Sequence, residues 1–149
     1  MQQQIITSIK STYNIHMKTD NYLVYVEDDE DDLMLMEEIM NKYKEINLVT
    51  VSDGQELLHF LEDQRDGELP CLVIMDNNTP RMSGIETARQ LKQDALFSKL
   101  PLIIITTSAS RTDADFCTQN NITLITKPST YPDWEALSQT FIQHCKPLS

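Results

Sequence analysis

The chain has 149 residues, of which 40% are hydrophobic and 23% are charged, and its formal net charge is -11 at pH 7. This length favours one domain with one core, and the apolar fraction is too high for a wholly disordered chain. The acidity, with no basic stripe to offset it, argues against nucleic acid and anionic membrane surfaces as partners. The longest strongly apolar stretches, Leu72 to Met75 and Leu102 to Ile105, are far shorter than the ~20 residues that cross a bilayer, so no membrane helix is expected.

Two segments flank the expected domain. Residues 1–20 have neither the sustained apolar core nor the small-residue cleavage site of a secretory signal. We interpret them as a flexible N-terminal extension, followed by the domain at 21–146 and a short tail at 147–149. Because no secretory signal is evident, the expected compartment is the cytoplasm.

The cysteines and histidines follow no disulfide or metal-site pattern. Cys71, Cys117 and Cys145 are odd in number, widely spaced and without a CxxC pair, so three free thiols are expected. The three histidines are scattered, and none pairs at helical spacing with another ligand-type side chain. Neither residue type predicts a zinc site.

Short apolar runs alternate with amphipathic segments along the chain. The runs are rich in β-branched residues, which together with their length favours strand over helix. The predicted strands are, in chain order, Tyr22–Val26, Ile46–Val51, Cys71–Met75, Pro101–Ile105 and Ile122–Ile125.

The segments between and after these strands carry helical patterns. The first and the last predicted helix each place apolar residues on one face: Leu33, Met36, Ile39, Met40 and Tyr43 in the first, and Trp134, Leu137, Phe141 and Cys145 in the last. Three helix starts carry the spacing of a capping box: Ser52 with Gln55, Ser83 with Glu86, and Thr130 with Asp133. Buried strands separated by such helices predict parallel βαβ crossovers, and therefore a doubly wound (βα)5 sandwich of the α/β class.

Polar side chains stand where these strands end. Glu27 and Asp28 follow the first strand, Asp76 follows the third, Thr106 the fourth, and Lys127 comes shortly after the fifth. Because parallel strands bring their carboxyl ends to one edge of the sheet, these groups converge if the strands are neighbours. Clustered carboxylates repel one another unless a cation neutralises them, and oxygen ligands of this kind suit Mg²⁺. Lys127 and Thr106 could then contact a phosphoryl group carried by Asp76.

These residues resemble the receiver domain of bacterial two-component response regulators. The resemblance covers about Asn21 to Lys146, and its motifs in order are YLVYVEDDEDD, LVIMDNNTPRMSG, LIIITTSAS and ITKPS. Each motif is weak alone, and together in this order they are specific. The resemblance implies a flavodoxin- and CheY-like three-layer fold with a parallel five-stranded sheet in the order 2-1-3-4-5.

The resemblance also assigns roles. Asp76 is the implied phosphoacceptor, and it receives its phosphoryl group from a sensor histidine kinase or a histidine phosphotransfer protein. The domain is not expected to be a substrate-turnover enzyme. The implied Mg²⁺ ligands are Glu27, Asp28, Asp76 and the backbone carbonyl of Asn78. Thr106 is the implied switch hydroxyl and Lys127 the family lysine, with a cis peptide bond between Lys127 and Pro128. Asn78 and Ser108 occupy the positions that tune self-dephosphorylation.

Two positions depart from the family pattern. Leu124 stands at the switch position, where an aromatic residue is usual, so this position has no aromatic ring whose rotation could signal. Thr107 adds bulk and a hydroxyl where a small residue is common. Since no further domain follows 146, the chain is expected to be a stand-alone receiver that acts on an unidentified downstream protein.

The acidic run from Glu27 to Asp32 is interpreted as two groups of residues with different roles. We interpret Glu27 and Asp28 as functional, and Asp31 and Asp32 mainly as residues that cap the first helix and favour solubility. Met34 points away from the apolar face of that helix, and a single exposed methionine usually has no function.

Other functions compete with the receiver. A pseudo-receiver scaffold would bind partners without phosphorylation, although every expected acceptor-site residue type is present. A haloacid dehalogenase-like phosphatase needs a second aspartate two residues after the nucleophile, and that position is Asn78. A flavin-binding module needs a Gly- and hydroxyl-rich phosphate loop, which the sequence lacks.

Overall fold

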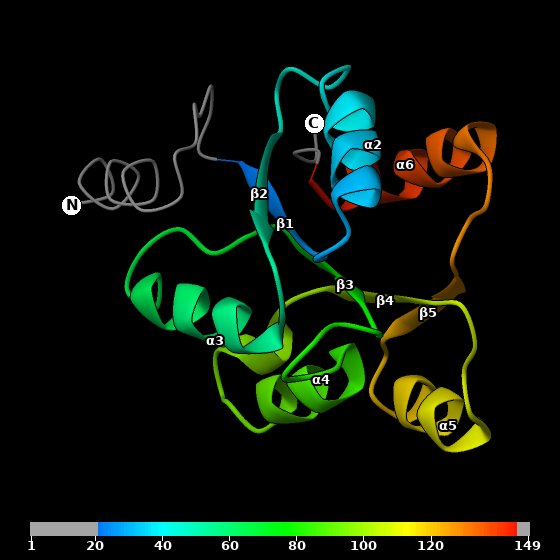
Figure 1. Ribbon diagram of the computed structural model, residues 1–149. Coiled ribbons are helices and arrows are strands. Elements are labelled where there is room, and N and C mark those ends of the chain that lie inside the picture. Colours follow the sequence, from blue (N-terminus) through cyan, green and yellow to red (C-terminus); the bar gives the residue numbers. More distant parts are fainter. Residues whose placement is uncertain (1–20, 146–149) are drawn as a thin grey trace.

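The apolar runs of the sequence pair into one sheet in the computed structural model, which describes residues 21–145 (Figure 1). All neighbouring strands are parallel and their order is β2-β1-β3-β4-β5, so the predicted fold class and strand order are confirmed. The strands are β1 (Tyr22–Val26), β2 (Asn47–Val51), β3 (Leu72–Asp76), β4 (Leu102–Thr106) and β5 (Thr123–Thr126).

Two of the polar strand-end residues belong to the sheet itself. The prediction ended the third and fourth strands at Met75 and Ile105, whereas β3 includes Asp76 and β4 includes Thr106. In the register of the ladder, Asp76 pairs with Ile105, and Thr106 pairs with Thr126 of β5. The sheet therefore fixes the backbone of both residues directly.

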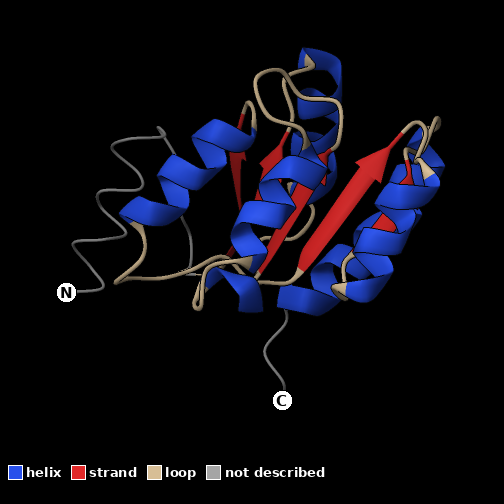
Figure 2. Cartoon of the chain, turned by 90° about the horizontal axis from the view of Figure 1, so that it is seen from below, coloured by secondary structure: helices blue, strands red, loops and turns tan. Residues whose placement is uncertain are grey.

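Within residues 21–145, five α-helices cover the two faces of the sheet (Figures 1 and 2). Helices α2 and α6 pack on one face, and α3, α4 and α5 pack on the other. A short 3-10 helix, η1 (Phe97–Lys99), leads into β4. The helices are α2 (Glu30–Met40), α3 (Gly54–Asp63), α4 (Gly84–Lys92), α5 (Arg111–Gln119) and α6 (Tyr131–Cys145).

Alternating strand residues supply both cores. In β1, Val24 packs with α3 and α4, while Leu23 and Tyr25 pack with α2 and α6. The ring of Tyr25 meets Trp134 of α6 edge to face, with ring centroids 6.5 Å apart. This two-sided burial explains why the strands read as continuous apolar runs rather than as alternating ones.

The helix starts agree with the capping prediction at two of three positions. Ser83 accepts from the Glu86 N–H at 3.2 Å, and Thr130 accepts from the Asp133 N–H at 3.3 Å. The assignment of Ser52 was wrong, because the cap of α3 is Asp53, whose carboxylate accepts from the Glu56 N–H at 3.0 Å. The carboxylate is the stronger acceptor at this helix start.

The expectation of three free thiols was also wrong. Cys71 and Cys145 form a disulfide across 74 residues of sequence, with Cα atoms 5.2 Å apart, while Cys117 is free and buried. Cys71 directly precedes β3, and Cys145 is the last residue of α6. The topology brings these two ends together at the amino ends of the strands, which spacing along the sequence does not reveal.

The implied cis peptide bond before Pro128 was wrong. The Lys127–Pro128 bond is trans, as are all peptide bonds in the part of the chain that is described, so the cis bond implied by the resemblance is corrected. Trans is the lower-energy isomer of an X-Pro bond.

The N-terminal extension and the tail lie outside the described residues. Between residues 21 and 145, no helix has the length and apolar character to cross a membrane.

Candidate functional site

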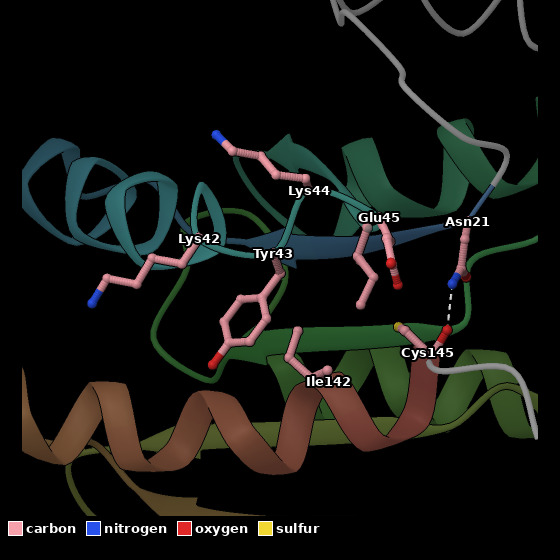
Figure 3. Close-up of a pocket in the computed structure, with 8 residues that line it drawn as sticks. Asn21, Lys42, Tyr43, Lys44, Glu45, Ile142 and Cys145 are labelled. Atoms are coloured by element: carbon pink, nitrogen blue, oxygen red, sulfur yellow. Dashed lines mark hydrogen bonds between the residues drawn. The ribbon is translucent and has the colours of Figure 1, made fainter.

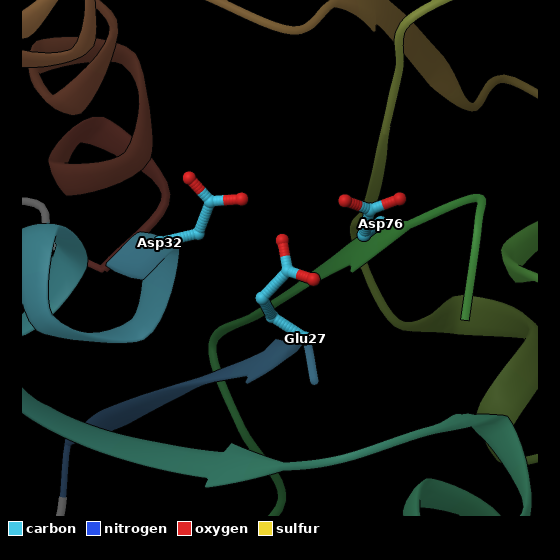
Figure 4. A group of neighbouring side chains, drawn as sticks. All are labelled: Glu27, Asp32 and Asp76. Atoms are coloured by element: carbon cyan, nitrogen blue, oxygen red, sulfur yellow. The ribbon is translucent and has the colours of Figure 1, made fainter. Parts of the chain in front are cut away.

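Three carboxylates meet at the carboxyl ends of the central strands (Figure 4). Glu27 directly follows β1, Asp76 ends β3, and Asp32 lies in the first turn of α2. One oxygen of each lies within 4.8 Å of the others, and the site is partly shielded from solvent because Glu27 and Asp76 are buried. The predicted convergence of strand ends is therefore present for Glu27 and Asp76, and α2 adds a third carboxylate.

The Lys127 ammonium contacts all three carboxylates. Its Nζ lies 2.8 Å from Asp76 Oδ2, 3.1 Å from Glu27 Oε1 and 2.6 Å from Asp32 Oδ2. Lys127 reaches the cluster because its backbone N–H donates to the Thr106 carbonyl at 2.8 Å, which holds the chain after β5 against β4. The ammonium donates hydrogen bonds to Glu27 and Asp76, and Asp32 is its third carboxylate partner, as an ion pair.

The Asp76 carboxylate is fixed from two sides. Oδ2 accepts from Lys127, and Oδ1 accepts from the backbone N–H of Asn78 at 2.7 Å. Helix α4 begins close behind it, because a side chain on Gly84 would place its Cβ 3.2 Å from the Asp76 carbonyl oxygen and from the Asn77 Cα. Glycine at this position thus allows the start of α4 to approach the acceptor loop.

The Glu27 carboxylate organises the turn into α2. Oε2 accepts from the backbone N–H groups of Asp28 at 3.1 Å and Asp29 at 3.3 Å, and Oε1 accepts from the Tyr25 hydroxyl at 3.2 Å. Asp29 then caps the helix by accepting from the Asp31 N–H. Glu27 is therefore both a member of the cluster and the anchor of the loop beside it.

The charges of the cluster shift its proton equilibria. Burial, and next the adjacent Asp76 carboxylate, raise the pKa of Glu27 to about 7, against the opposing effect of Lys127. Burial alone would raise the pKa of Asp76, but hydrogen bonds from Lys127 and the Asn78 N–H hold it below its ordinary value. Burial alone would likewise lower the pKa of Lys127, but its carboxylate contacts raise it. Asp76 therefore stays ionised beside a charged ammonium at neutral pH.

The acidic run is divided differently from its interpretation in the sequence. Asp28 is exposed and its carboxylate lies outside the cluster, whereas Asp32, assigned to capping and solubility, contacts Lys127. Helical spacing was the signal that could have found Asp32. It lies four and seven residues before Met36 and Ile39, the buried residues of α2, so it heads the face that turns toward the sheet.

The implied switch and tuning residues lie on β4 and β5 and in the loops after β3 and β4. Thr106 is buried, and its hydroxyl donates to the Ser108 carbonyl at 2.6 Å. Asn78 is exposed, and its side-chain amide donates to the Thr107 hydroxyl at 3.4 Å, which links the loops after β3 and β4. Leu124 of β5 is half-buried and packs against the core that faces α3, α4 and α5.

An ion pair that the sequence analysis missed also supports the acceptor loop. Arg81 has a φ of 64°, in the left-handed region, and its Nε donates to Asp53 Oδ2 at 2.6 Å. Asp53 is buried and caps α3. The pair ties the loop that follows Asp76 to the start of the neighbouring helix.

A pocket of about 320 Å³ lies at the other end of the sheet, near the disulfide (Figure 3). In Figure 3 the Lys42 and Lys44 ammonium groups point away from it. None of the predicted site residues lines this pocket, so the carboxyl-end cluster remains the candidate site. The residues that line the pocket are Asn21, Lys42, Tyr43, Lys44, Glu45, Ile46, Ile142 and Cys145.

Comparison with known proteins identifies relatives of the chain. The family model of the response regulator receiver domain matches residues 23–137. Response regulator Rcp1 of Synechocystis sp. is 28% identical over 95 residues, which cover 61% of this chain and 65% of Rcp1. Hybrid signal transduction histidine kinase D of Dictyostelium discoideum is 32% identical over 100 residues, which cover 67% of this chain but 6% of the kinase. The chain thus spans less than two thirds of the length of these relatives.

Solved structures share the fold. The Mn²⁺-bound form of response regulator Rcp1 superposes with a TM-score of 0.74 at 22% identity, covering 87% of this chain and 97% of that one. A two-component response regulator from Legionella pneumophila superposes with a TM-score of 0.66 at 27% identity, covering 82% and 96%. Both superpositions extend over nearly the whole of the compared chains.

Proposed function

This chain belongs to the response regulator receiver domain family, and we propose that it receives a phosphoryl group on Asp76 from a phosphohistidine. The observation that carries the proposal is the Asp76 carboxylate, which ends β3, stays ionised and lies 2.8 Å from the Lys127 ammonium. Members of this family are signalling domains and not enzymes that turn over a substrate.

In the proposed transfer, an Asp76 carboxylate oxygen forms a bond to phosphorus as the bond between phosphorus and the donor imidazole nitrogen breaks. The electron pair of the broken bond stays on the imidazole nitrogen. Lys127 already contacts Asp76 Oδ2, and its ammonium can pair with the added negative charge on the phosphoryl oxygens. The low pKa of Asp76 keeps the nucleophile ionised at neutral pH.

The clustered carboxylate oxygens of Glu27, Asp32 and Asp76 are hard ligands that Mg²⁺ prefers. We propose that Glu27, Asp76 and the backbone carbonyl of Asn78 hold the ion together with Asp28, whose carboxylate is exposed and lies outside the cluster. When bound, it neutralises negative charge on the acceptor and the phosphoryl group. The Mn²⁺-bound form of Rcp1, a relative with this fold, supports the assignment of a divalent cation.

The proposed switch begins at Thr106 and Lys127. Contacts from these residues to the phosphoryl group favour one of two arrangements of the loops after β3 and β4. Leu124 lies on β5, beside β4, and takes the place of the switch aromatic. Asn78, whose backbone N–H donates to Asp76, and Ser108, whose carbonyl accepts from Thr106, set the phosphoryl lifetime. The output is a changed affinity of the surface formed by α5, β5 and α6 for a downstream protein.

The proposed donor is a sensor histidine kinase or a histidine phosphotransfer protein, acting in the cytoplasm. The likeness to hybrid signal transduction histidine kinase D of Dictyostelium discoideum supports this class of donor. Neither nucleic acid nor a membrane enters the proposed function, in keeping with the net charge of -11.

Intact-protein mass spectrometry tests the proposal. The wild-type protein is incubated with acetyl phosphate and Mg²⁺, beside Asp76→Asn and the matched variant Asp115→Asn, which changes an exposed aspartate of α5. We expect one phosphoryl adduct in wild type and Asp115→Asn, none in Asp76→Asn, and none when EDTA removes the cation.

Rapid hydrolysis is controlled by titration with beryllofluoride, which mimics the phosphoryl group without turning over. A chain with neither an adduct nor beryllofluoride binding would contradict the proposal and leave the pseudo-receiver scaffold. An adduct of equal yield in Asp76→Asn would place the acceptor elsewhere.

A further inference from the structure

The carboxylate of Asp32 has no role in the proposed function, yet it makes the shortest of the three contacts to Lys127, at 2.6 Å. Its side chain is 19% exposed, as is that of Lys127, so the pair is largely shielded from solvent. Glu27, Asp76 and Lys127 all come from strand ends, whereas Asp32 belongs to a helix. The contact therefore joins α2 to the acceptor site.

The local geometry excludes helix capping as the role of this carboxylate. Asp32 stands three residues after the cap residue Asp29, where an acidic side chain commonly reaches back to the backbone N–H of the cap. That N–H instead donates to Glu27 Oε2 at 3.3 Å. Because Glu27 already accepts the Asp29 N–H, the Asp32 carboxylate is left to pair with Lys127.

We propose that Asp32 is a positioning residue that holds the Lys127 ammonium over the acceptor carboxylate. The ammonium donates hydrogen bonds to Glu27 Oε1 at 3.1 Å and to Asp76 Oδ2 at 2.8 Å, and its ion pair with Asp32 at 2.6 Å holds Nζ where it can make both. When Asp76 carries a phosphoryl group, the N–H that faces Asp76 meets a phosphoryl oxygen, while the contacts to Glu27 and Asp32 keep Nζ in place. This inference rests on the proposed phosphoryl transfer to Asp76.

The positioning role and simple electrostatic repulsion predict opposite changes in the phosphorylation rate when Asp32 is neutralised. A carboxylate near the acceptor repels an incoming phosphoryl group, so its neutralisation alone would speed phosphorylation. If Asp32 acts by holding Lys127, its neutralisation slows phosphorylation, because the ammonium loses its nearest ion-pair partner and the position that this partner gives it. The direction of the change therefore separates the two effects.

The test compares Asp32→Asn with Asp31→Asn, which removes the same charge from the neighbouring exposed position of the same helix. For Asp32→Asn we expect the rate of phosphoryl uptake from acetyl phosphate, and the affinity for beryllofluoride, to fall roughly threefold to tenfold. Asp31→Asn should retain wild-type values, and Asp32→Glu should recover most of the loss. A faster or unchanged rate in Asp32→Asn, or an equal loss in Asp31→Asn, would overturn the proposal.

A second readout reports Lys127 itself. Nitrogen-15 NMR of the lysine ammonium groups is recorded on the metal-free protein without any phosphoryl donor. An ordered Lys127 signal is expected in wild type and Asp31→Asn, and its broadening or loss is expected in Asp32→Asn. An unchanged Lys127 signal in Asp32→Asn would contradict the positioning role.

Denaturant unfolding of the metal-free protein supplies a double-mutant cycle. Asp32→Asn should lower the unfolding midpoint in the wild-type background but not in the background of Lys127→Ala, or of Lys127→Gln if the alanine variant fails to fold. An equal decrease in both backgrounds would mean that Asp32 acts without Lys127. If wild type takes up no phosphoryl group, the proposed function fails, and the ammonium signal and this cycle alone decide whether Asp32 positions Lys127.

Discussion

The Thr106 hydroxyl donates a hydrogen bond to the Ser108 carbonyl oxygen over 2.6 Å and accepts one from the Ser108 backbone N–H at 3.2 Å. A hydroxyl has a single proton to donate. Contact with a phosphoryl oxygen on Asp76 therefore requires Thr106 to release the Ser108 carbonyl, which frees the loop after β4 to move.

We expect Thr106→Ala to separate phosphoryl binding from this loop movement. Beryllofluoride should still bind at Asp76, but the backbone amide shifts that it causes at residues 107–110 in wild type should fall to less than roughly half. Thr106→Ser keeps the hydroxyl and serves as the control. The measurement is a two-dimensional amide NMR spectrum with and without beryllofluoride, and equal shifts in the alanine variant would contradict the expectation.

Removal of the ammonium should destabilise the metal-free protein. Lys127→Ala leaves three carboxylates with oxygens within 4.8 Å and no cation among them, so the free energy of unfolding should fall by about 2 kcal/mol or more at pH 7. Mg²⁺ should restore a larger part of the stability in this variant than it adds to wild type, since it supplies the missing positive charge. Thermal unfolding with and without Mg²⁺ measures both effects.

The matched control is Lys99→Ala, which removes an exposed lysine of η1. This variant should unfold within about 0.5 kcal/mol of wild type. An equal loss of stability in both variants would mean that net charge, rather than the local cluster, sets the effect.

The pH dependence of stability should carry the signature of Glu27. Its pKa is about 7 in the folded protein, against an ordinary value of 4.5, so the folded state binds more protons at this site between those pH values. The contribution of Glu27 to the free energy of unfolding therefore decreases as the pH rises through this window, by at most about 1.4 kcal/mol per pH unit. The pKa of Asp76 is lowered, so its contribution is lost only at more acidic pH.

Denaturant unfolding of wild type and Glu27→Gln in EDTA, from pH 5 to pH 8, measures this effect. The difference in unfolding free energy, wild type minus variant, should decrease with rising pH. A constant or increasing difference would show that the pKa of Glu27 is not raised.

The disulfide predicts one reactive thiol in the denatured, non-reduced protein, that of Cys117, and three after reduction. Reduction should lower the free energy of unfolding by about 2–4 kcal/mol, because the bond restricts the unfolded chain. The double variant Cys71→Ser and Cys145→Ser should show no response to the reductant. Thiol titration and unfolding with and without a dithiol check these outcomes, and three thiols without reduction would contradict the bond.

The sequence predicted the sheet well because each strand is a short apolar run between helical patterns. The ends of β3 and β4 were each placed one residue early, since backbone pairing continues into Asp76 and Thr106 although their side chains are polar. The cap of α3 was assigned to Ser52 instead of Asp53, because both are good acceptors and one residue of register decides between them.

The site was predictable where polar residues follow apolar strands, as at Glu27, Asp76 and Lys127. Asp32 was missed because, within an unbroken acidic run, only helical geometry separates the inward carboxylate from the exposed ones. The disulfide was missed for a different reason, since it joins two ends at the opposite edge of the fold that only the complete topology brings together.

The bond between Cys71 and Cys145 turns the second half of the chain into a covalent ring. Asp76, Thr106 and Lys127 are all members of this ring, whereas Glu27 and Asp32 lie on the linear arm that leads into it. While the bond is closed, the acceptor, the hydroxyl and the ammonium remain tethered to one another even in the unfolded chain, and the two acidic partners must be recruited from outside the ring as the arm folds onto it.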